Sequence, residues 1–334
     1  MPNAIVLGGT GLIGRAAALR LARAGWDVVV TGRDPRHVPA ALTEAGVRFV
    51  ASDRRDPAAL AAVLGAGADL LVDACCFTAD DARSLLPYLP GIGSAAMISS
   101  KAVYVDAQGR HINSPERPDF GGPVREDTAT LEPAWDGRYR SRDGYGRNKV
   151  AAERVLLESG HPVSVLRASK VHGVGATLPR EWHFVRRVLD GRRVVLFAHD
   201  GRGFDHPTAA ANVAALVEAV GERPGSRVLN IADPDVPTGR EIARAIAARL
   251  GHAWEEVLVP GDEPGRHPWD VVPGITLDLR AAEAIGYRPA GGYHDLIGPT
   301  IDAVAAHGLD APWAAEAEDA DVDYAAEDAY LARR

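Results

Sequence analysis

Tyr145 and Lys149 have the residue types and the spacing of a proton-transfer pair. On a helix, residues i and i+4 lie on one face, so the Lys149 ammonium would lie beside the Tyr145 hydroxyl. A neighbouring ammonium favours the phenolate form of a tyrosine, which can then give or take a proton near neutral pH. Tyr-x-x-x-Lys is a frequent chance match, so the hypothesis needs further residues to support it.

Two serines supply that support, because Ser99 and Ser100 end an apolar, strand-like run at 94–99. In a sheet of parallel strands, the carboxyl ends of the strands border the ligand crevice. A serine hydroxyl at that edge can hydrogen-bond the same substrate oxygen as the tyrosine. The alternative is that both serines only cap the end of the strand.

A glycine-rich segment lies between the first expected strand and the first expected helix, and residues 5–14 read Ile-Val-Leu-Gly-Gly-Thr-Gly-Leu-Ile-Gly. Glycine allows a tight turn and a close approach of the backbone to a pyrophosphate, and the following helix start offers free N–H groups. Glycines in such turns can also serve packing alone. We expect a dinucleotide to contact Gly8, Thr10, Gly11, Leu12, Ile13 and Gly14.

The end of the second strand should choose between the two nicotinamide cofactors. An acidic residue there accepts from the ribose of NAD, whereas a basic residue accommodates the 2′-phosphate of NADP. Gly32 stands where the acid is expected and Arg33 follows it, which favours NADP(H) and leaves NAD(H) possible. The alternative is a solvated Arg33 with Asp34 at the ribose. Asp53, at the end of the third strand, would meet the adenine edge or cap the next helix.

The elements that would position these residues alternate between strand and helix. Strand-like runs at 3–8, 27–31, 47–51, 69–74, 94–99, 162–168 and 227–232 alternate with helical patterns at 12–24, 57–65, 79–88, 144–159 and 208–220. This order predicts an α/β fold with a Rossmann-type doubly wound parallel sheet. Residues 104–143 show no period and are expected to form a functional loop. Further helices are expected at 179–190, 239–251, 279–285 and 294–307.

Three regions follow from this pattern. Residues 1–168 and 205–232 are expected to form the dinucleotide-binding Rossmann domain, and residues 169–204 and 233–313 a smaller C-terminal α/β substrate-binding lobe. Residues 314–334 form an acidic C-terminal tail. The last twenty residues hold seven acids and two arginines, and so carry −5 of the total net charge of −8. Because Trp313, Tyr324 and Tyr330 are interleaved with these acids, we predict that the tail docks on its own subunit or on a partner.

Taken together, the motifs resemble those of the extended short-chain dehydrogenases/reductases of the NAD-dependent epimerase/dehydratase family. The matching pieces are Gly8 to Gly14, Ser99-Ser100-x-x-Val103-Tyr104, Tyr145-x-x-x-Lys149, Leu166-Arg167 and the late segment 279–289. Their order and spacing cover roughly residues 3 to 305 and are far more specific than any single motif.

This resemblance implies roles for individual residues. Tyr145 would be the catalytic acid/base, and Lys149 would bind the nicotinamide ribose and tune Tyr145. The catalytic serine lies four residues before the tyrosine of the Val-Tyr pair, which selects Ser100 over Ser99. Ala74 and Cys75 follow the fourth strand, where the backbone of the family passes the cofactor. Small packing residues are the alternative for the cysteines.

Departures from the family pattern narrow the expected reaction. Sugar 4,6-dehydratases of the family carry Asp-Glu after the catalytic residue, but Lys101-Ala102 stands here, so that dehydration is not expected. Many members have an aromatic–Gly pair and an Asn-bearing loop after Leu-Arg. This chain has residues 168–173, Ala-Ser-Lys-Val-His-Gly, which puts the usual anchoring of a nucleotide sugar in doubt.

Four further residues are candidates for substrate contact. Only three of the 37 cationic residues are lysines, and two of them, Lys101 and Lys170, follow expected strand ends near the proposed chemistry. His172 and His183 could face the substrate, although structural or surface positions are more common for histidine. The spacing of the histidines does not match a metal site, so we expect no metal.

Composition and charge exclude several classes of protein. The chain has 334 residues, of which 46% are hydrophobic, enough for a large core, so intrinsic disorder is excluded for most of it. An acidic balance disfavours nucleic-acid binding, and no apolar stretch is long enough to span a membrane. Two adjacent cysteines without a disulfide framework suggest a reducing compartment, so we expect a cytoplasmic protein. A homodimer is implied by the family resemblance alone.

The reaction expected first is NADP(H)-dependent oxidation or reduction of a small or sugar-like alcohol or carbonyl. The second possibility is an NAD(P)-dependent sugar epimerase that retains its cofactor. A third, from another class, is a non-catalytic dinucleotide-sensing Rossmann protein. Intact Ser100, Tyr145 and Lys149 disfavour this third possibility.

Overall fold

The computed structural model describes residues 1–308, 313 and 323–334, and these form two compact units. Unit 1 comprises Met1–Val171, Ala210–Ala232 and Leu277–Ala290, and unit 2 comprises His172–Ala209, Asp233–Thr276 and Gly291–Arg334. Both units are therefore assembled from several chain segments. Leu277–Ala290, which the sequence-based boundaries put in the smaller lobe, clusters with unit 1.

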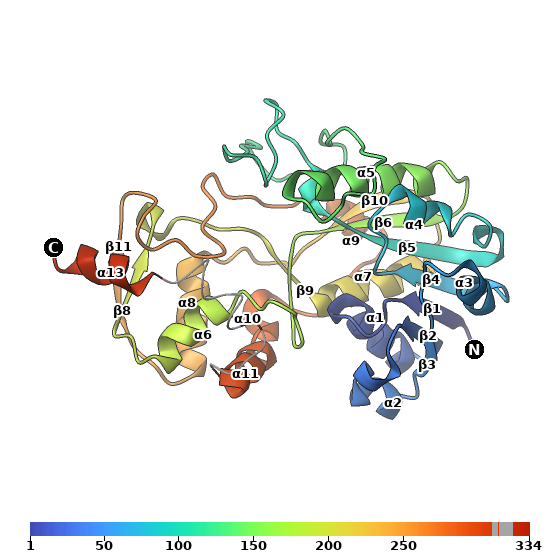
Figure 1. Ribbon diagram of the computed structural model, residues 1–334, viewed down its shortest axis with the longest axis horizontal. Helices are drawn as coiled ribbons and strands as arrows, with labels where there is room; N and C mark the ends of the chain where they lie inside the picture. Colours follow the sequence, from blue (N-terminus) through green and yellow to red (C-terminus); the bar gives the residue numbers. More distant parts are fainter. Residues whose placement is uncertain (309–312, 314–322) are drawn as a thin grey trace. The chain divides into compact units, whose positions relative to one another are not determined.

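Unit 1 is built on a sheet of seven parallel strands (Figure 1). The strands are β1 (Asn3–Leu7), β2 (Asp27–Gly32), β3 (Arg48–Ala51), β4 (Ala68–Asp73), β5 (Ile92–Ser100), β6 (Val163–Ala168) and β10 (Arg227–Ile231). Their order is β10-β6-β5-β4-β1-β2-β3, so the direction of strand progression reverses between β1 and β4. This arrangement confirms the Rossmann-type doubly wound fold. Ligands of such sheets bind outside the strand ends at the reversal point.

Helices cover both faces of this sheet, which explains why its strands are apolar without alternation. In β1, Ala4 and Val6 belong to the core under one face, and Ile5 and Leu7 belong to the core under the other. The first face carries α1 (Leu12–Arg23), α2 (Ala40–Glu44), α7 (Ala210–Glu222) and α9 (Arg280–Ala284). The second carries α3 (Pro57–Leu64), α4 (Ala79–Arg83) and α5 (Arg142–Leu157).

The expected long loop is present between β5 and α5. Only the short 3₁₀ turn η3 (Lys101–Val103) interrupts it, and two further 3₁₀ turns of unit 1 are η1 (Pro35–His37) and η2 (Leu89–Gly91). Isolated bridges tie the loop down, because Tyr104 pairs with Thr130 and Val124 pairs with Leu277. The first bridge joins two residues of the loop itself, and the second ties the loop to Leu277–Ala290 of unit 1.

Unit 2 is smaller and has its own aromatic core around Phe184, Phe197 and Trp269. Its helices are α6 (Trp182–Leu189), α8 (Gly239–Arg249), α10 (Tyr293–Leu296), α11 (Gly298–His307) and α13 (Tyr324–Leu331). Its short strands are β8 (Val194–Phe197), β9 (Pro207–Ala209) and β11 (Glu255–Leu258), with the turn η4 (His199–Gly201), and β7 (Lys170–His172) crosses the boundary between the units. The single helix expected at 294–307 is two helices, because Pro299 has no N–H and starts a new one.

The described end of the tail docks on unit 2, as predicted. Tyr324 donates to Asp190 at 2.7 Å, and Glu327 forms an ion pair with Arg187 at 2.5 Å. Tyr330 and Leu331 pack against a small core of Leu196, Val257 and Val259. The rest of the predicted tail, residues 314–322, lies outside the described residues. No described helix is long and apolar enough to cross a membrane.

Candidate active site

The glycine-rich turn lies at the carboxyl end of β1, beside the point where the strand order reverses. Gly8 has a φ of 75°, which a residue with a side chain rarely adopts. A Cβ on Gly14 would lie 2.3 Å from the Gly8 carbonyl oxygen. Glycine is therefore required here by the turn and by the close approach of helix α1 to the strand.

The start of α1 fits a pyrophosphate. Its first residue follows Gly11, which provides no side-chain cap, and no acidic residue occupies the first turn. A Cβ at Gly11 would meet nothing nearer than the Gly8 carbonyl at 3.5 Å, so the approach to the helix N–H groups is open. Unsatisfied N–H groups and the positive end of the helix dipole favour an anion at this position.

The end of β2 presents an exposed Arg33 and a fully engaged Asp34. The Asp34 carboxylate accepts from the backbone and side chain of Arg36, and these bonds lower the pKa of Asp34 to about 2. Asp34 is thus occupied by its own turn, whereas the Arg33 side chain is exposed. Asp53 is also exposed and accepts from the Arg55 N–H at 3.0 Å, while Asp56 caps α3. Asp53 is therefore not the helix cap.

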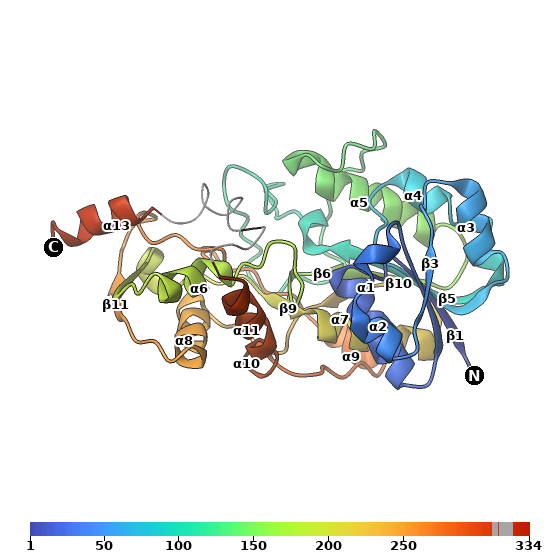
Figure 2. The ribbon, with the colours of Figure 1, turned by 60° about the horizontal axis from the view of Figure 1, so that its bottom comes forward.

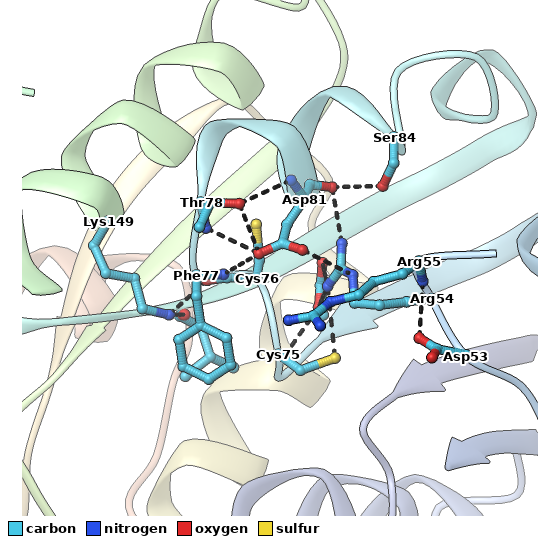
Figure 3. A network of polar contacts seen from close by, with 12 residues as sticks. Asp53, Arg54, Arg55, Cys75, Cys76, Phe77, Thr78, Asp81, Ser84 and Lys149 are labelled. Atoms are coloured by element: carbon cyan, nitrogen blue, oxygen red, sulfur yellow. Dashed lines mark hydrogen bonds and ion pairs between the residues drawn. The ribbon is translucent and has the colours of Figure 1, made fainter. Parts of the chain in front are cut away.

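Arg54 ties together the strand ends next to the glycine turn, a role that the sequence did not reveal. Its guanidinium binds the Asp73 carboxylate at 2.7 Å and donates to the Asp81 carbonyl at 2.8 Å (Figure 3). The same guanidinium donates to the Cys75 sulfur at 3.5 Å. This network fixes the backbone at Ala74 and Cys75, next to Gly8, where a cofactor contact is expected.

Neither cysteine has the environment of a reactive thiol. Burial, together with the nearby Asp73 carboxylate, raises the pKa of Cys75 to about 12. Burial raises the pKa of Cys76 as well. Both thiols are free and protonated, in agreement with small packing residues.

The two serines at the end of β5 have different surroundings. Ser99 is buried, and its hydroxyl donates to the Glu153 carboxylate. Ser100 is partly exposed, and its oxygen accepts from the Ala102 N–H at 3.2 Å, which caps η3. Of the two, Ser100 is therefore the one that could still meet a substrate.

Tyr145 and Lys149 lie one turn apart on α5, as the spacing predicts. The Lys149 ammonium is buried and donates to the carbonyls of Cys76 at 2.7 Å and Ile98 at 2.8 Å. It lies 5.9 Å from the centre of the Tyr145 ring and 4.6 Å from that of Phe77. Lys149 thus joins the ends of β4 and β5 to the helix that carries Tyr145.

Phe77 is a second residue that the sequence did not single out. Its ring stacks on Tyr139 of the long loop, with 4.9 Å between ring centres. The Lys149 ammonium lies beside the same ring (Figure 3). The sequence signal was slight, because Phe77 is only one more apolar residue after β4.

The four candidate substrate residues have separate surroundings. Lys101 is buried in η3, whereas Lys170 is partly exposed in β7. His172 is buried with its Nε2 atom 2.7 Å from the Asp233 carboxylate. His183 is part of the aromatic core of unit 2 beside Phe184, and burial lowers its pKa well below the usual value. This environment is that of a structural histidine.

Among residues 1–308, 313 and 323–334, no group of three or more His, Cys, Asp or Glu side chains could hold a metal ion. A metal-free site remains a prediction.

Comparison with known proteins agrees with the motifs. The model of the NAD dependent epimerase/dehydratase family matches residues 4–87, which contain the glycine turn and the first four strands. No curated protein sequence matches the chain.

Solved structures resemble the chain along nearly its whole length. A putative epimerase from Burkholderia cenocepacia J2315 has a TM-score of 0.69 at 20% identity, covering 91% of this chain and 98% of its own. UDP-glucose-4-epimerase from Stenotrophomonas maltophila, with bound NAD and formylated UDP-arabinopyranose, has a TM-score of 0.69 at 19% identity, covering 93% and 100%. MoeE5 in complex with UDP-glucose and NAD has a TM-score of 0.65 at 19% identity, covering 92% and 99%.

The family match and the structural similarities differ in how much of the chain they cover. The chain has the fold of these solved structures along nearly its whole length, and residues 4–87 match the NAD dependent epimerase/dehydratase family. The family resemblance read from the motifs is confirmed for the segment with the glycine turn, and the motifs at Ser100 and Tyr145 lie outside the matched residues.

Proposed function

We propose that the protein is an NADP(H)-dependent oxidoreductase that interconverts a carbonyl and an alcohol by hydride transfer. The observation that carries the proposal is the position of Tyr145 and Lys149 one turn apart, with the Lys149 ammonium bound to the end of β5, two residues before Ser100. Ser100 stands at the carboxyl edge of the sheet, where ligands of doubly wound folds bind.

The residues of the chain divide the work as follows. Ser100 donates a hydrogen bond to the substrate oxygen and fixes its direction. Tyr145 gives that oxygen a proton in reduction and takes one in oxidation. Lys149 is held by two carbonyls, so that its remaining N–H can orient the ribose of the cofactor. Bound NADP(H) supplies or accepts the hydride.

The proposed preference for NADP(H) rests on the end of β2. Gly32 replaces the acid that would accept from the ribose of NAD, and Asp34 is engaged by Arg36. The exposed Arg33 guanidinium then provides a charge for a 2′-phosphate. Structural neighbours are described with NAD, so NAD(H) remains the competing cofactor.

A cofactor-retaining epimerase is the second candidate. It is favoured by the neighbours named as epimerases, among them UDP-galactose 4-epimerase at a TM-score of 0.63. The substrate would then be a sugar nucleotide that is oxidised and reduced again at one carbon. Lys101-Ala102 in place of Asp-Glu argues against a dehydratase in either case.

Cofactor stoichiometry separates these reactions. The purified protein is incubated with NADPH or NADP and a panel of aldehydes, ketones, keto-sugars and nucleotide sugars, with absorbance and product analysis in parallel. Steady oxidation of NADPH in step with alcohol formation supports the proposal. Product formation without net change in cofactor supports the epimerase, and cofactor binding without any turnover supports a dinucleotide sensor.

Two further expectations complete the proposal. A reducing, cytoplasmic location fits two protonated free cysteines. Assembly as a homodimer is expected from the family resemblance.

A further inference from the structure

We infer that Glu153 is a positioning residue that sets how α5 lies on β5, and thereby where Lys149 and Tyr145 stand relative to Ser100. This inference rests on the proposed function for its catalytic meaning. Tyr145, Lys149 and Glu153 are spaced at i, i+4 and i+8 and therefore share one face of α5.

Two neighbouring residues of β5 receive this face of the helix. The Lys149 ammonium donates to the Ile98 carbonyl at 2.8 Å, and the next residue, Ser99, donates its hydroxyl to Glu153. These two hydrogen bonds are one helical turn apart, so together they fix both the rotation and the register of α5 on β5. Ser100 follows directly, so its position is set by the same ties.

An ion pair from the adjacent strand holds Glu153 in place. Arg167 is the register partner of Ser99 in the β5–β6 pair, and its Nη2 atom lies 2.6 Å from the Glu153 carboxylate. Its Nε atom lies 3.2 Å and 3.3 Å from the two carboxylate oxygens, so the guanidinium binds in a forked geometry. Burial alone would lower the pKa of Arg167, but the Glu153 carboxylate raises it.

The same guanidinium reaches the long loop. Arg167 Nη1 donates to the Glu126 carbonyl at 3.2 Å, and the guanidinium lies 4.8 Å from the centre of the Tyr104 ring. Tyr104 in turn donates to the Asn230 amide oxygen at 2.6 Å. One buried cluster therefore joins the helix with Tyr145, the strand with Ser100 and the loop between them.

General energetics favour positioning over stability as the role of this cluster. Burying two charges costs about as much as their attraction returns, and well-packed apolar residues often replace such pairs without loss. Glu153 and Arg167 have only 2% and 5% of their surface exposed, so their charges are almost fully withdrawn from water. The forked Arg167–Glu153 contact is directional, so it holds α5 and β6 in one relative geometry more strictly than apolar packing would.

The chain offers a matched control. Glu327 forms a buried ion pair with Arg187 at 2.5 Å in unit 2, whereas α5 and β5 belong to unit 1. Glu153→Gln and Glu327→Gln therefore remove the same charge from the same kind of pair. Ser99→Ala is a milder second variant, because it removes one tie to Glu153 and leaves the ion pair intact.

The test uses the lysines, of which the chain has only three. Full-length protein is labelled with ¹³C at the lysine ε carbon, the Lys149 resonance is assigned with Lys149→Arg, and cofactor binding, kcat and KM are measured beside it. We expect Glu153→Gln to shift the Lys149 resonance and to lower kcat about tenfold to a hundredfold at unchanged cofactor affinity, as for small misplacement of reacting groups. Ser99→Ala should shift the same resonance less, and Glu327→Gln should lower stability without moving it.

A Lys149 resonance that stays in place in both Glu153→Gln and Ser99→Ala overturns the inference, whatever happens to stability. If the Lys149 resonance shifts in the variants but the wild-type protein turns over no carbonyl substrate, the positioning role is supported and the proposed function is contradicted. If the wild-type protein turns over carbonyl substrates but the Lys149 resonance stays in place in both variants, the proposed function is supported and the positioning role is contradicted.

Discussion

The proposed preference for NADP(H) over NAD(H) depends on one exposed side chain, Arg33, at the end of β2. We predict that Arg33→Ala raises KM for NADPH about tenfold to a hundredfold and leaves KM for NADH nearly unchanged, because a hydrogen bond to a charged group contributes about 1.5–3 kcal/mol. Initial rates with both cofactors measure this directly.

Arg48→Ala is the matched control for Arg33. Arg48 is a similarly exposed arginine at the start of β3, paired only loosely with Asp27 at 3.9 Å. It lies at the opposite end of the sheet from the cofactor edge, so neither KM should change. Equal changes for both cofactors in Arg33→Ala would contradict the assignment of Arg33 to a 2′-phosphate.

The reactivity of the two cysteines reports on the environment next to the glycine turn. Because burial and Asp73 raise the pKa of Cys75 to about 12, and Cys76 is fully buried, we predict that a thiol reagent labels neither in the native protein at about pH 8. The unfolded protein should react at both positions. Rapid labelling of native Cys75 would show that Arg54 and Asp73 hold it differently.

At the scale of elements, α13 is a helix that owes its position to side-chain contacts. Two arginines flank it, since Arg187 binds Glu327 and Arg192 binds Asp328, each at 2.5 Å. The guanidinium of Arg192 also lies 4.5 Å from the Tyr324 ring. The helix is too short to be stable alone, so these contacts must supply its stability.

The two acids of α13 should differ strongly in their effect. Glu327→Gln leaves a buried arginine without its partner and should lower the free energy of unfolding by about 3–5 kcal/mol. Asp328→Asn breaks a pair whose acid is 60% exposed and screened by solvent, so it should lower the free energy of unfolding far less. Urea unfolding of both variants provides the comparison. Equal losses would mean that α13 is not seated as described.

The elements of unit 1 could be predicted from sequence because each has a local cause. Buried apolar runs define β1, β2 and β4, and the glycines after β1 mark the turn. Tyr145 and Lys149 could be placed on a helix from spacing alone. The split of α10 from α11 was missed, although Pro299 signals it, because the apolar pattern continues across the break.

Other parts of the site could not be predicted, because they depend on contacts between distant segments. Arg54 reads as one more arginine after Asp53, and only the fold brings it to Asp73 and Cys75. The preference for Ser100 came from the family pattern, and the structure adds that Ser99 is occupied by Glu153. Glu153 continues the i+4 spacing from Tyr145, a signal that could have been used.

On the scale of the whole molecule, the chain concentrates its proposed chemistry in unit 1. The glycine turn, Arg33, Ser100, Tyr145 and Lys149 all belong to this unit, whose sheet places the ends of β1, β4 and β5 along one edge. Figure 2 shows β1, β3, β5, β6 and β10 of this sheet in a second view. Unit 2 holds its own core and the docked α13, and its short strands β8 and β11 were too brief for the sequence pattern to reveal.

The central claim is that Tyr145 moves the proton in a nicotinamide-dependent reaction. Its most direct test is Tyr145→Phe, compared with wild type for turnover and, by calorimetry, for NADPH binding. Tyr88→Phe, which removes a hydroxyl near the amino end of β5, serves as the control. We predict that Tyr145→Phe loses turnover by about a hundredfold or more, that NADPH affinity stays the same, and that Tyr88→Phe behaves as wild type. Full activity in Tyr145→Phe would contradict the proposed mechanism.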